Sequence, residues 1–123
     1  MPQITPAHAQ HFTQDWLAAW NAHDLDRILA HYTNDFEMTS PLIPQITGEP
    51  SATLRGKPAV RAYWQKALQL IPDLQFKHLA TFTGVDSIAI HYLGAKNRPS
   101  LEVFHFAPSH PHLVQKAFAH YAT

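Results

Sequence analysis

Apolar residues recur at spacings of three and four in three segments, and each segment predicts a helix. The first helix extends from about Pro6 to Ala22, with Thr5 suited to cap it. Its apolar stripe consists of Phe12, Trp16, Ala19 and Trp20. Asp24 is placed to cap a short second helix that ends near Tyr32. The third helix spans residues 57–71 and stops at Pro72, because proline cannot continue a helix.

The remaining segments are rich in β-branched and aromatic residues and predict strands. One short strand comes early, at residues 35–40. The others follow the third helix at residues 74–85, 87–94, 100–107 and 113–122. Because their connections are short, we expect an antiparallel meander. Residues 41–55 contain three prolines and no clear period, which predicts a long ordered loop over the mouth of the fold.

This order predicts an α+β fold, with three N-terminal helices packed on a curved antiparallel sheet. The length of 123 residues suits a single domain covering residues 1–123. The face of the sheet turned away from the helices is predicted to be apolar as well, and its expected members are Leu101, Val103, Ala117, Ala119 and Tyr121. A sheet that is apolar on both faces needs a second cover, so we expect a homodimer packed through the outer sheet face.

The composition and the absence of known motifs argue against several classes of partner, location and cofactor. Nine basic and nine acidic side chains give a formal net charge of zero, which favours neither nucleic acid nor membrane surfaces as partners. The chain has no cysteine, no apolar run long enough to span a bilayer and no signal-peptide pattern, so we expect a cytoplasmic protein. The ten histidines show no metal-binding spacing, and no nucleotide-binding motif occurs. We therefore expect neither a metal nor a cofactor.

Four segments, taken in order along the chain, carry a family resemblance. They are WLAAWNAHDLD (16–26), HYTNDFEMTSP (31–41), LRGKPAVRAYW (54–64) and, near the C-terminus, EVFHF (102–106) with AHY (119–121). Together they resemble the nuclear-transport-factor-2-like superfamily. The most similar group is SnoaL-like, a relative of ketosteroid isomerases and polyketide cyclases. The resemblance implies a cystatin-like, cone-shaped α+β barrel with an internal pocket, commonly dimeric.

The resemblance also allows a test of function. A ketosteroid isomerase uses a carboxylate base, a tyrosine and a protonated acid, and the matching positions hold Ser40, Trp16 and Glu102. A serine hydroxyl has no accessible conjugate base near neutral pH, and an indole offers one N–H donor. Because only Glu102 keeps a carboxyl group, we do not expect a standard ketosteroid isomerase.

Two residues are candidates for catalysis, Glu102 and His120. Glu102 shares strand parity with Phe104 and Phe106, which predicts an inward, desolvated carboxyl group with a raised pKa. The alternative is a Glu102 that pairs with a basic residue. His120 shares parity with Val114, which predicts an imidazole facing Glu102 across neighbouring strands. The alternative is a His120 bonded to backbone near the rim.

The parities of the predicted strands and helices define a mostly aromatic pocket with few polar groups. Its predicted lining is Trp16, Tyr32, Met38, Ser40, Tyr63, Phe82, Tyr92, Glu102, Phe104 and His120. Such a pocket suits a small, largely apolar ligand that carries one or two oxygen atoms. One functional hypothesis is an isomerase, cyclase or dehydratase. In it Glu102 acts as the acid–base group or as an oxyanion donor, and His120, Tyr32 or Ser40 assists. The other is a non-catalytic ligand-binding or dimeric accessory module.

Overall fold

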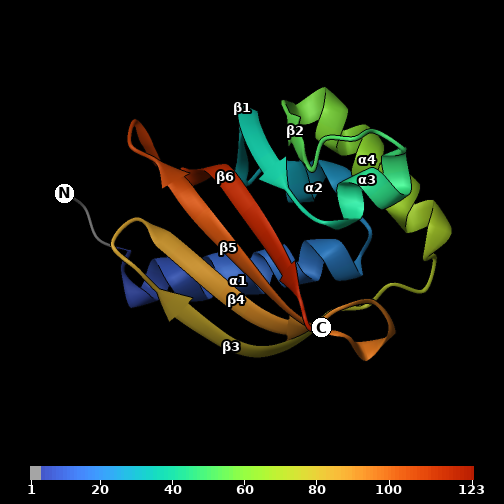
Figure 1. The fold of residues 1–123 in the computed structure, drawn as a ribbon. Coiled ribbons are helices and arrows are strands. Elements are labelled where there is room, and N and C mark those ends of the chain that lie inside the picture. The colour runs from blue at the N-terminus through green and yellow to red at the C-terminus, as the bar shows by residue number, and fades with distance from the viewer. Residues whose placement is uncertain (1–3) are drawn as a thin grey trace.

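The computed structural model describes residues 4–123, which form a six-stranded sheet and four α-helices (Figure 1). The helices are α1 (Pro6–Asn21), α2 (Leu25–Leu29), α3 (Leu42–Thr47) and α4 (Lys57–Leu70). The strands are β1 (Tyr32–Thr39), β2 (Thr53–Arg55), β3 (Lys77–Thr83), β4 (Ser87–Leu93), β5 (Pro99–Ala107) and β6 (His110–Tyr121). This confirms the α+β class. No helix of the described residues is long and apolar enough to cross a membrane.

Local chemistry sets the starts of the three predicted helices. Thr5 caps α1, because its side chain accepts a hydrogen bond from the backbone N–H of His8 at 3.0 Å. Asp24 caps α2, because its side chain accepts a hydrogen bond from the backbone N–H of Arg27 at 3.1 Å. Gly56 precedes α4 with a φ of 88°, a backbone conformation that suits glycine better than any other residue. The predicted helices therefore correspond to α1, α2 and α4. They do not all precede the sheet, since β1 and β2 come before α4.

The strand order is β2-β1-β6-β5-β4-β3, and β3 to β6 form the predicted antiparallel meander. The prediction of a wholly antiparallel sheet is wrong at one place, because β1 pairs with β6 in parallel. No short connection joins these two strands in the sequence, so nothing local fixed their relative direction. The predicted loop at residues 41–55 is also wrong in part, because it contains α3 and the edge strand β2.

Two irregularities in the ladders reverse the alternation of side chains. In β3, His78 pairs with Tyr92 and Ala80 pairs with His91, which leaves Leu79 as an extra residue. In β6, Val114 pairs with Phe106 and Lys116 pairs with His105, which leaves Gln115 as the extra residue. Beyond each β-bulge, every side chain lies on the face opposite to the one that simple alternation predicts.

The bulge in β6 corrects the predicted faces of that strand. Ala117 and Ala119 are buried on the inner face and Tyr121 is half-buried there, whereas all three were predicted on the outer face. His120 was predicted inward, but it is exposed on the outer face beside Leu101. The bulge in β3 likewise turns Phe82 outward, where 56% of its surface is exposed.

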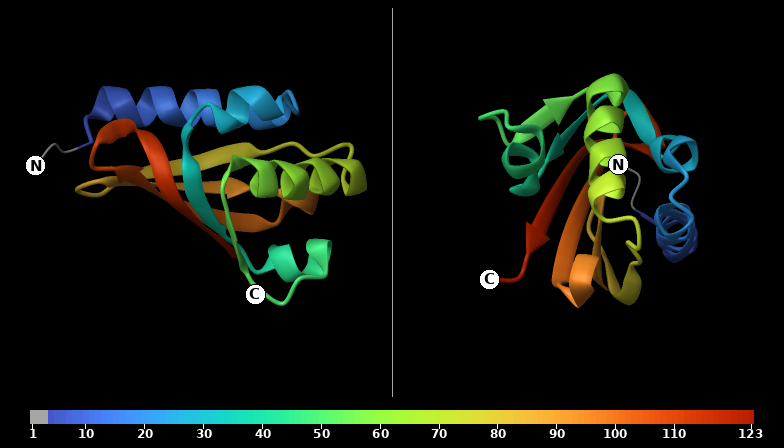
Figure 2. Two further views of the ribbon diagram at one scale, coloured as in Figure 1. Left: turned by 90° about the horizontal axis from the view of Figure 1, so that it is seen from above. Right: turned by 90° about the vertical axis from the view of Figure 1, so that its right-hand side faces the viewer.

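Helices α1 and α4 lie over the inner face of the sheet (Figure 2). The C-terminal end of α1 is fixed to the start of β3 by Asn21. Its side chain donates to the carbonyl of Phe76 at 3.0 Å and accepts from the N–H of Phe76 at 2.6 Å. These bonds hold Phe76 against Trp16 and Trp20 of α1, with ring centroids 5.5 and 5.4 Å away.

Candidate functional site

A cavity of about 80 Å³ lies between the inner face of the sheet and helices α1, α3 and α4. Its walls are mostly apolar. All three tryptophans of the chain contribute to them, together with Leu42 and Ile46 of α3. The sheet contributes Met38, Glu102 and Tyr121. Glu102 supplies the one carboxyl group among the described residues that line this cavity.

Glu102 sits in the middle of β5, with Ile90 on one side and Ala119 on the other. It is 5% exposed, and Tyr92 donates a hydrogen bond from its hydroxyl to Glu102 Oε1 at 3.2 Å. Burial in this apolar surrounding raises the pKa of Glu102 from 4.5 to about 7, although the Tyr92 hydrogen bond opposes the rise. Near neutral pH the group therefore exists in both protonated and ionised forms, as a general acid or base requires.

All four tyrosines of the chain surround this carboxyl group. Burial, followed by the charge of Glu102, raises the pKa of Tyr32 and of Tyr92 well above the usual value. Burial also raises the pKa of Tyr63 and of Tyr121, and Glu102 adds to both shifts. All four hydroxyls therefore stay neutral over the physiological pH range. They can donate hydrogen bonds but are not bases.

Trp16 and Ser40, which the sequence resemblance matches to two functional groups of ketosteroid isomerases, both make local hydrogen bonds. Trp16 Nε1 donates to the hydroxyl of Tyr32 at 3.0 Å. Ser40, which is fully buried, accepts a hydrogen bond from the backbone N–H of Leu42 at 3.1 Å. These bonds fix the cavity wall and the start of α3, respectively.

The structure brings together most of the predicted site residues. Trp16, Met38, Tyr63 and Glu102 line the cavity, and Tyr32, Ser40, Tyr92 and Phe104 are buried beside it. Phe82 and His120 were placed wrongly, because each lies beyond a β-bulge that turns it to the outer face. His120 consequently cannot contact Glu102 as an inward-facing partner.

Sequence reasoning missed several residues that line the cavity, notably Trp20, Trp64 and Tyr121. Trp20 follows Trp16 by four positions, so the two share one helix face, and this spacing was enough to place Trp20 in the pocket. Tyr121 could not be found by parity, because the bulge at Gln115 reverses it.

Asp15 forms a separate cluster with Arg27 and His31 and is not among the residues that line the cavity. Its carboxylate bonds to the Arg27 guanidinium, and Asp15 Oδ2 lies 2.7 Å from His31 Nε2. The hydrogen bond from Arg27 lowers the pKa of Asp15, and the bond with His31 adds to the shift. This cluster connects α1 to α2 and to the residue before β1, which is a structural role.

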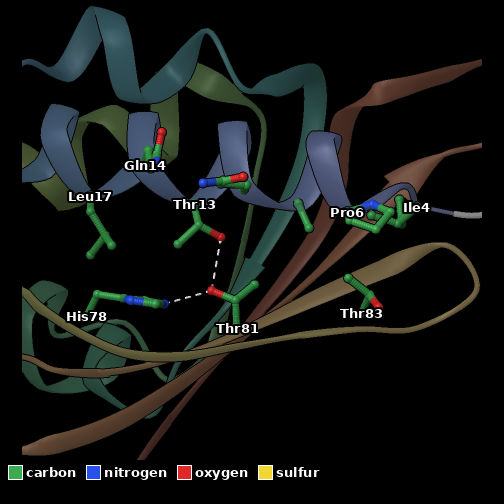
Figure 3. Close-up of a pocket in the computed structure, with 10 residues that line it drawn as sticks. Ile4, Pro6, Thr13, Gln14, Leu17, His78, Thr81 and Thr83 are labelled. Carbon is green, nitrogen blue, oxygen red and sulfur yellow. Dashed lines mark hydrogen bonds between the residues drawn. The ribbon is translucent and has the colours of Figure 1, made fainter.

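A second hollow, of about 520 Å³, lies between α1 and the edge strand β3. Figure 3 shows Thr13 and His78 both reaching Thr81, with oxygen–oxygen and nitrogen–oxygen distances of 3.2 and 2.8 Å. No carboxyl group lies among the described residues of its lining. Within residues 4–123, no three His, Cys, Asp or Glu side chains gather as a metal site requires. The cavity that contains Glu102 is therefore the stronger candidate.

A family model for the SnoaL-like domain matches residues 13–110. The chain belongs to the SnoaL-like family. A SnoaL-like protein of unknown function from Burkholderia thailandensis is 61% identical to it, and their match covers 98% of this chain and 99% of that one, with a TM-score of 0.92. A search of curated proteins found no match.

More distant structures share the fold of this SnoaL-like chain. A proposed polyketide cyclase from Streptomyces antibioticus matches with a TM-score of 0.73 at 14% identity, over 92% of this chain and 91% of that one. A protein with a ketosteroid isomerase-like fold from Catenulispora acidiphila, in complex with trimethylamine, matches with a TM-score of 0.71 at 12% identity. That match covers 96% of this chain and 87% of the other. At these identities the likeness concerns the fold alone.

Proposed function

We propose that this SnoaL-like chain binds a small, largely apolar, oxygen-bearing molecule in the cavity and transforms it by general acid–base chemistry at Glu102. The observation that carries the proposal is the buried carboxyl group of Glu102, whose pKa of about 7 allows it to give and take a proton near neutral pH. The reaction class is isomerisation, cyclisation or dehydration, in which a proton leaves one atom of the substrate and another is delivered nearby. We also propose that residues 1–123 form one domain whose helices and sheet make a cone-shaped enclosure around the cavity.

The residues around Glu102 suit this chemistry. Ionised Glu102 would accept the proton, and the resulting carboxylic acid would return it to a second atom of the same substrate. The apolar walls exclude water and so strengthen every polar contact inside the cavity. Tyr92 holds the carboxyl group in place through its hydrogen bond, while Tyr63 and Tyr121 supply neutral donors for developing negative charge on the substrate.

Replacing Glu102 with Gln tests the proposal, because Gln keeps the size and hydrogen bonding of the acid but cannot exchange the proton. For any substrate found by screening, we expect Glu102→Gln to lower kcat by at least about a hundredfold, the usual contribution of general acid–base catalysis. The carboxyl carbon of Glu102, followed by NMR through a pH titration, is expected to titrate near pH 7. Full activity in the variant would eliminate Glu102 as the acid–base group.

The size of the cavity favours a second candidate function. Ligand pockets usually enclose about 300–1,000 Å³, whereas this cavity measures about 80 Å³. A compact ligand held without turnover would fit such a space, and the trimethylamine complex of the Catenulispora acidiphila protein is an example of a very small ligand in this fold. Binding that persists with no product formed, in both the original protein and Glu102→Gln, would support this ligand-binding role.

We also propose a homodimer packed through the outer sheet face. Val103 and Phe118 pair across β5 and β6 on that face, and Phe82 lies there with 56% of its surface exposed. We expect Val103→Glu to shift the protein from dimer to monomer in sedimentation experiments at micromolar concentration. Val85→Glu is the matched control, because Val85 is 54% exposed in the turn after β3. A monomeric unmodified protein would refute the dimer.

A further inference from the structure

Trp20 carries an unusual polar atom. Among the described residues, its indole Nε1 is the one buried side-chain nitrogen or oxygen without a hydrogen-bond partner. Trp20 is 6% exposed and lines the same cavity as Glu102. Buried donors are almost always paired, because an unpaired one keeps the cost of losing water and gains nothing in return. This N–H therefore needs an acceptor that the described chain does not supply.

Three aromatic rings pack around the indole of Trp20. Trp64 packs edge-on against it with ring centroids 5.1 Å apart, and Phe76 lies 5.4 Å away. Trp16 occupies a third side at 6.3 Å. The neighbouring amide of Asn21 is already committed to the backbone of Phe76. The orientation of the indole is thus fixed by packing rather than by a hydrogen bond of its own.

We propose that the Trp20 N–H donates a hydrogen bond to an oxygen atom of the bound molecule, and that the ligand is a compact, neutral compound with an acceptor oxygen, of which a ketone is the simplest example. This inference rests on the proposed function, because the ligand occupies the same cavity. An organic ammonium ion has no lone pair and therefore cannot accept a hydrogen bond from the Trp20 N–H. A carboxylate ligand would share an apolar cavity with ionised Glu102, and both charges would be desolvated. A neutral acceptor oxygen, such as that of a ketone, avoids both penalties.

NMR of the three indole N–H groups tests the inference directly, with cyclopentanone as the probe. Methylenecyclopentane is the control ligand, because it has nearly the same shape but no oxygen. We expect cyclopentanone to move the Trp20 indole proton downfield and methylenecyclopentane to leave it without such a shift. Trp20→Phe assigns the signal and is expected to weaken cyclopentanone binding about tenfold, the usual effect of one lost hydrogen bond at a buried site.

Trp64→Phe is the matched control variant, since it removes the same ring volume from the same cavity. We expect it to weaken both probes equally, whereas Trp20→Phe weakens cyclopentanone more than methylenecyclopentane. Cyclopentanone that binds and perturbs Glu102 while the Trp20 signal stays unshifted would overturn the role of Trp20 and leave the proposed function standing. Failure of both probes to perturb any residue of the cavity at saturating concentration would count against the proposed function and this inference together. If Trp20→Phe does not fold, the indole shift in the unmodified protein still decides.

Discussion

Replacing Glu102 with Gln is expected to stabilise the protein by about 2.5 kcal/mol more at pH 8.5 than at pH 5. The pKa of Glu102 is about 7 in the folded protein and 4.5 in the reference state. Between these values the folded state holds a proton that the unfolded state has lost. Stability therefore falls as pH rises from 4.5 to 7 and levels off above 7. Gln has no acidic proton, so the stability of the variant does not fall as the pH rises through this range.

Urea unfolding of the unmodified protein and the variant at the two pH values measures the difference. Glu49→Gln is the control, because Glu49 is exposed in the segment between α3 and β2. It removes the same charge without removing a buried carboxyl group, so we expect it to have the same effect at both pH values. The expectation is wrong if Glu102→Gln, like Glu49→Gln, changes the free energy of unfolding by the same amount at both pH values. Glu102 would then ionise as easily in the folded protein as in the unfolded chain.

A second large effect is expected from two neighbouring positions of β6. Ala119 is 6% exposed and pairs with Glu102 across the ladder, so Ala119→Asp places a second carboxyl group beside the first in an apolar surrounding. We expect a loss of at least about 3 kcal/mol in the free energy of unfolding, as for other unpaired buried charges. His120→Asp introduces the same side chain on the exposed outer face, where we expect a change within about 0.5 kcal/mol.

Urea unfolding at pH 8 compares these two variants, and a mainly unfolded Ala119→Asp protein would agree with the expectation. The comparison tests the bulge at Gln115 directly, because unbroken alternation along β6 would exchange the two outcomes. A His120→Asp protein that is the less stable of the pair would show that the inner face carries His120 after all.

The positions of α1, α2 and α4 could be predicted well from the sequence, because their signals are local, whereas α3 lies in a segment that was predicted as a loop. A capping threonine or aspartate and a stripe of apolar residues suffice to locate α1 and α2, and Thr5 and Asp24 make the expected hydrogen bonds. The inward position of Glu102 could also be predicted, because β5 alternates regularly from Ser100 to Phe106.

Side-chain faces in β3 and β6 could not be predicted in the same way. A bulge is a property of two paired strands, so a sequence read one strand at a time gives no warning of the extra residues Leu79 and Gln115. An extra residue reverses the face of every later position in its strand, which explains why Phe82 in β3 and His120 in β6 were each misplaced. The parallel pairing of β1 with β6 was missed for a related reason, since it joins segments distant in the sequence.

The gathering of every tryptophan and tyrosine around one carboxyl group has a practical consequence for spectroscopy. The chain has three tryptophans and four tyrosines. The tryptophans, Tyr63 and Tyr121 line the cavity, and the charge of Glu102 raises the pKa of Tyr32 and Tyr92. Indole emission depends strongly on nearby polar groups, and no such ring stands elsewhere in the chain to dilute the signal. The tryptophan and tyrosine signals of the protein, in intrinsic fluorescence and in near-ultraviolet circular dichroism, therefore report on the cavity and the groups around Glu102. Ligand entry and the ionisation of Glu102 can be followed optically without a label.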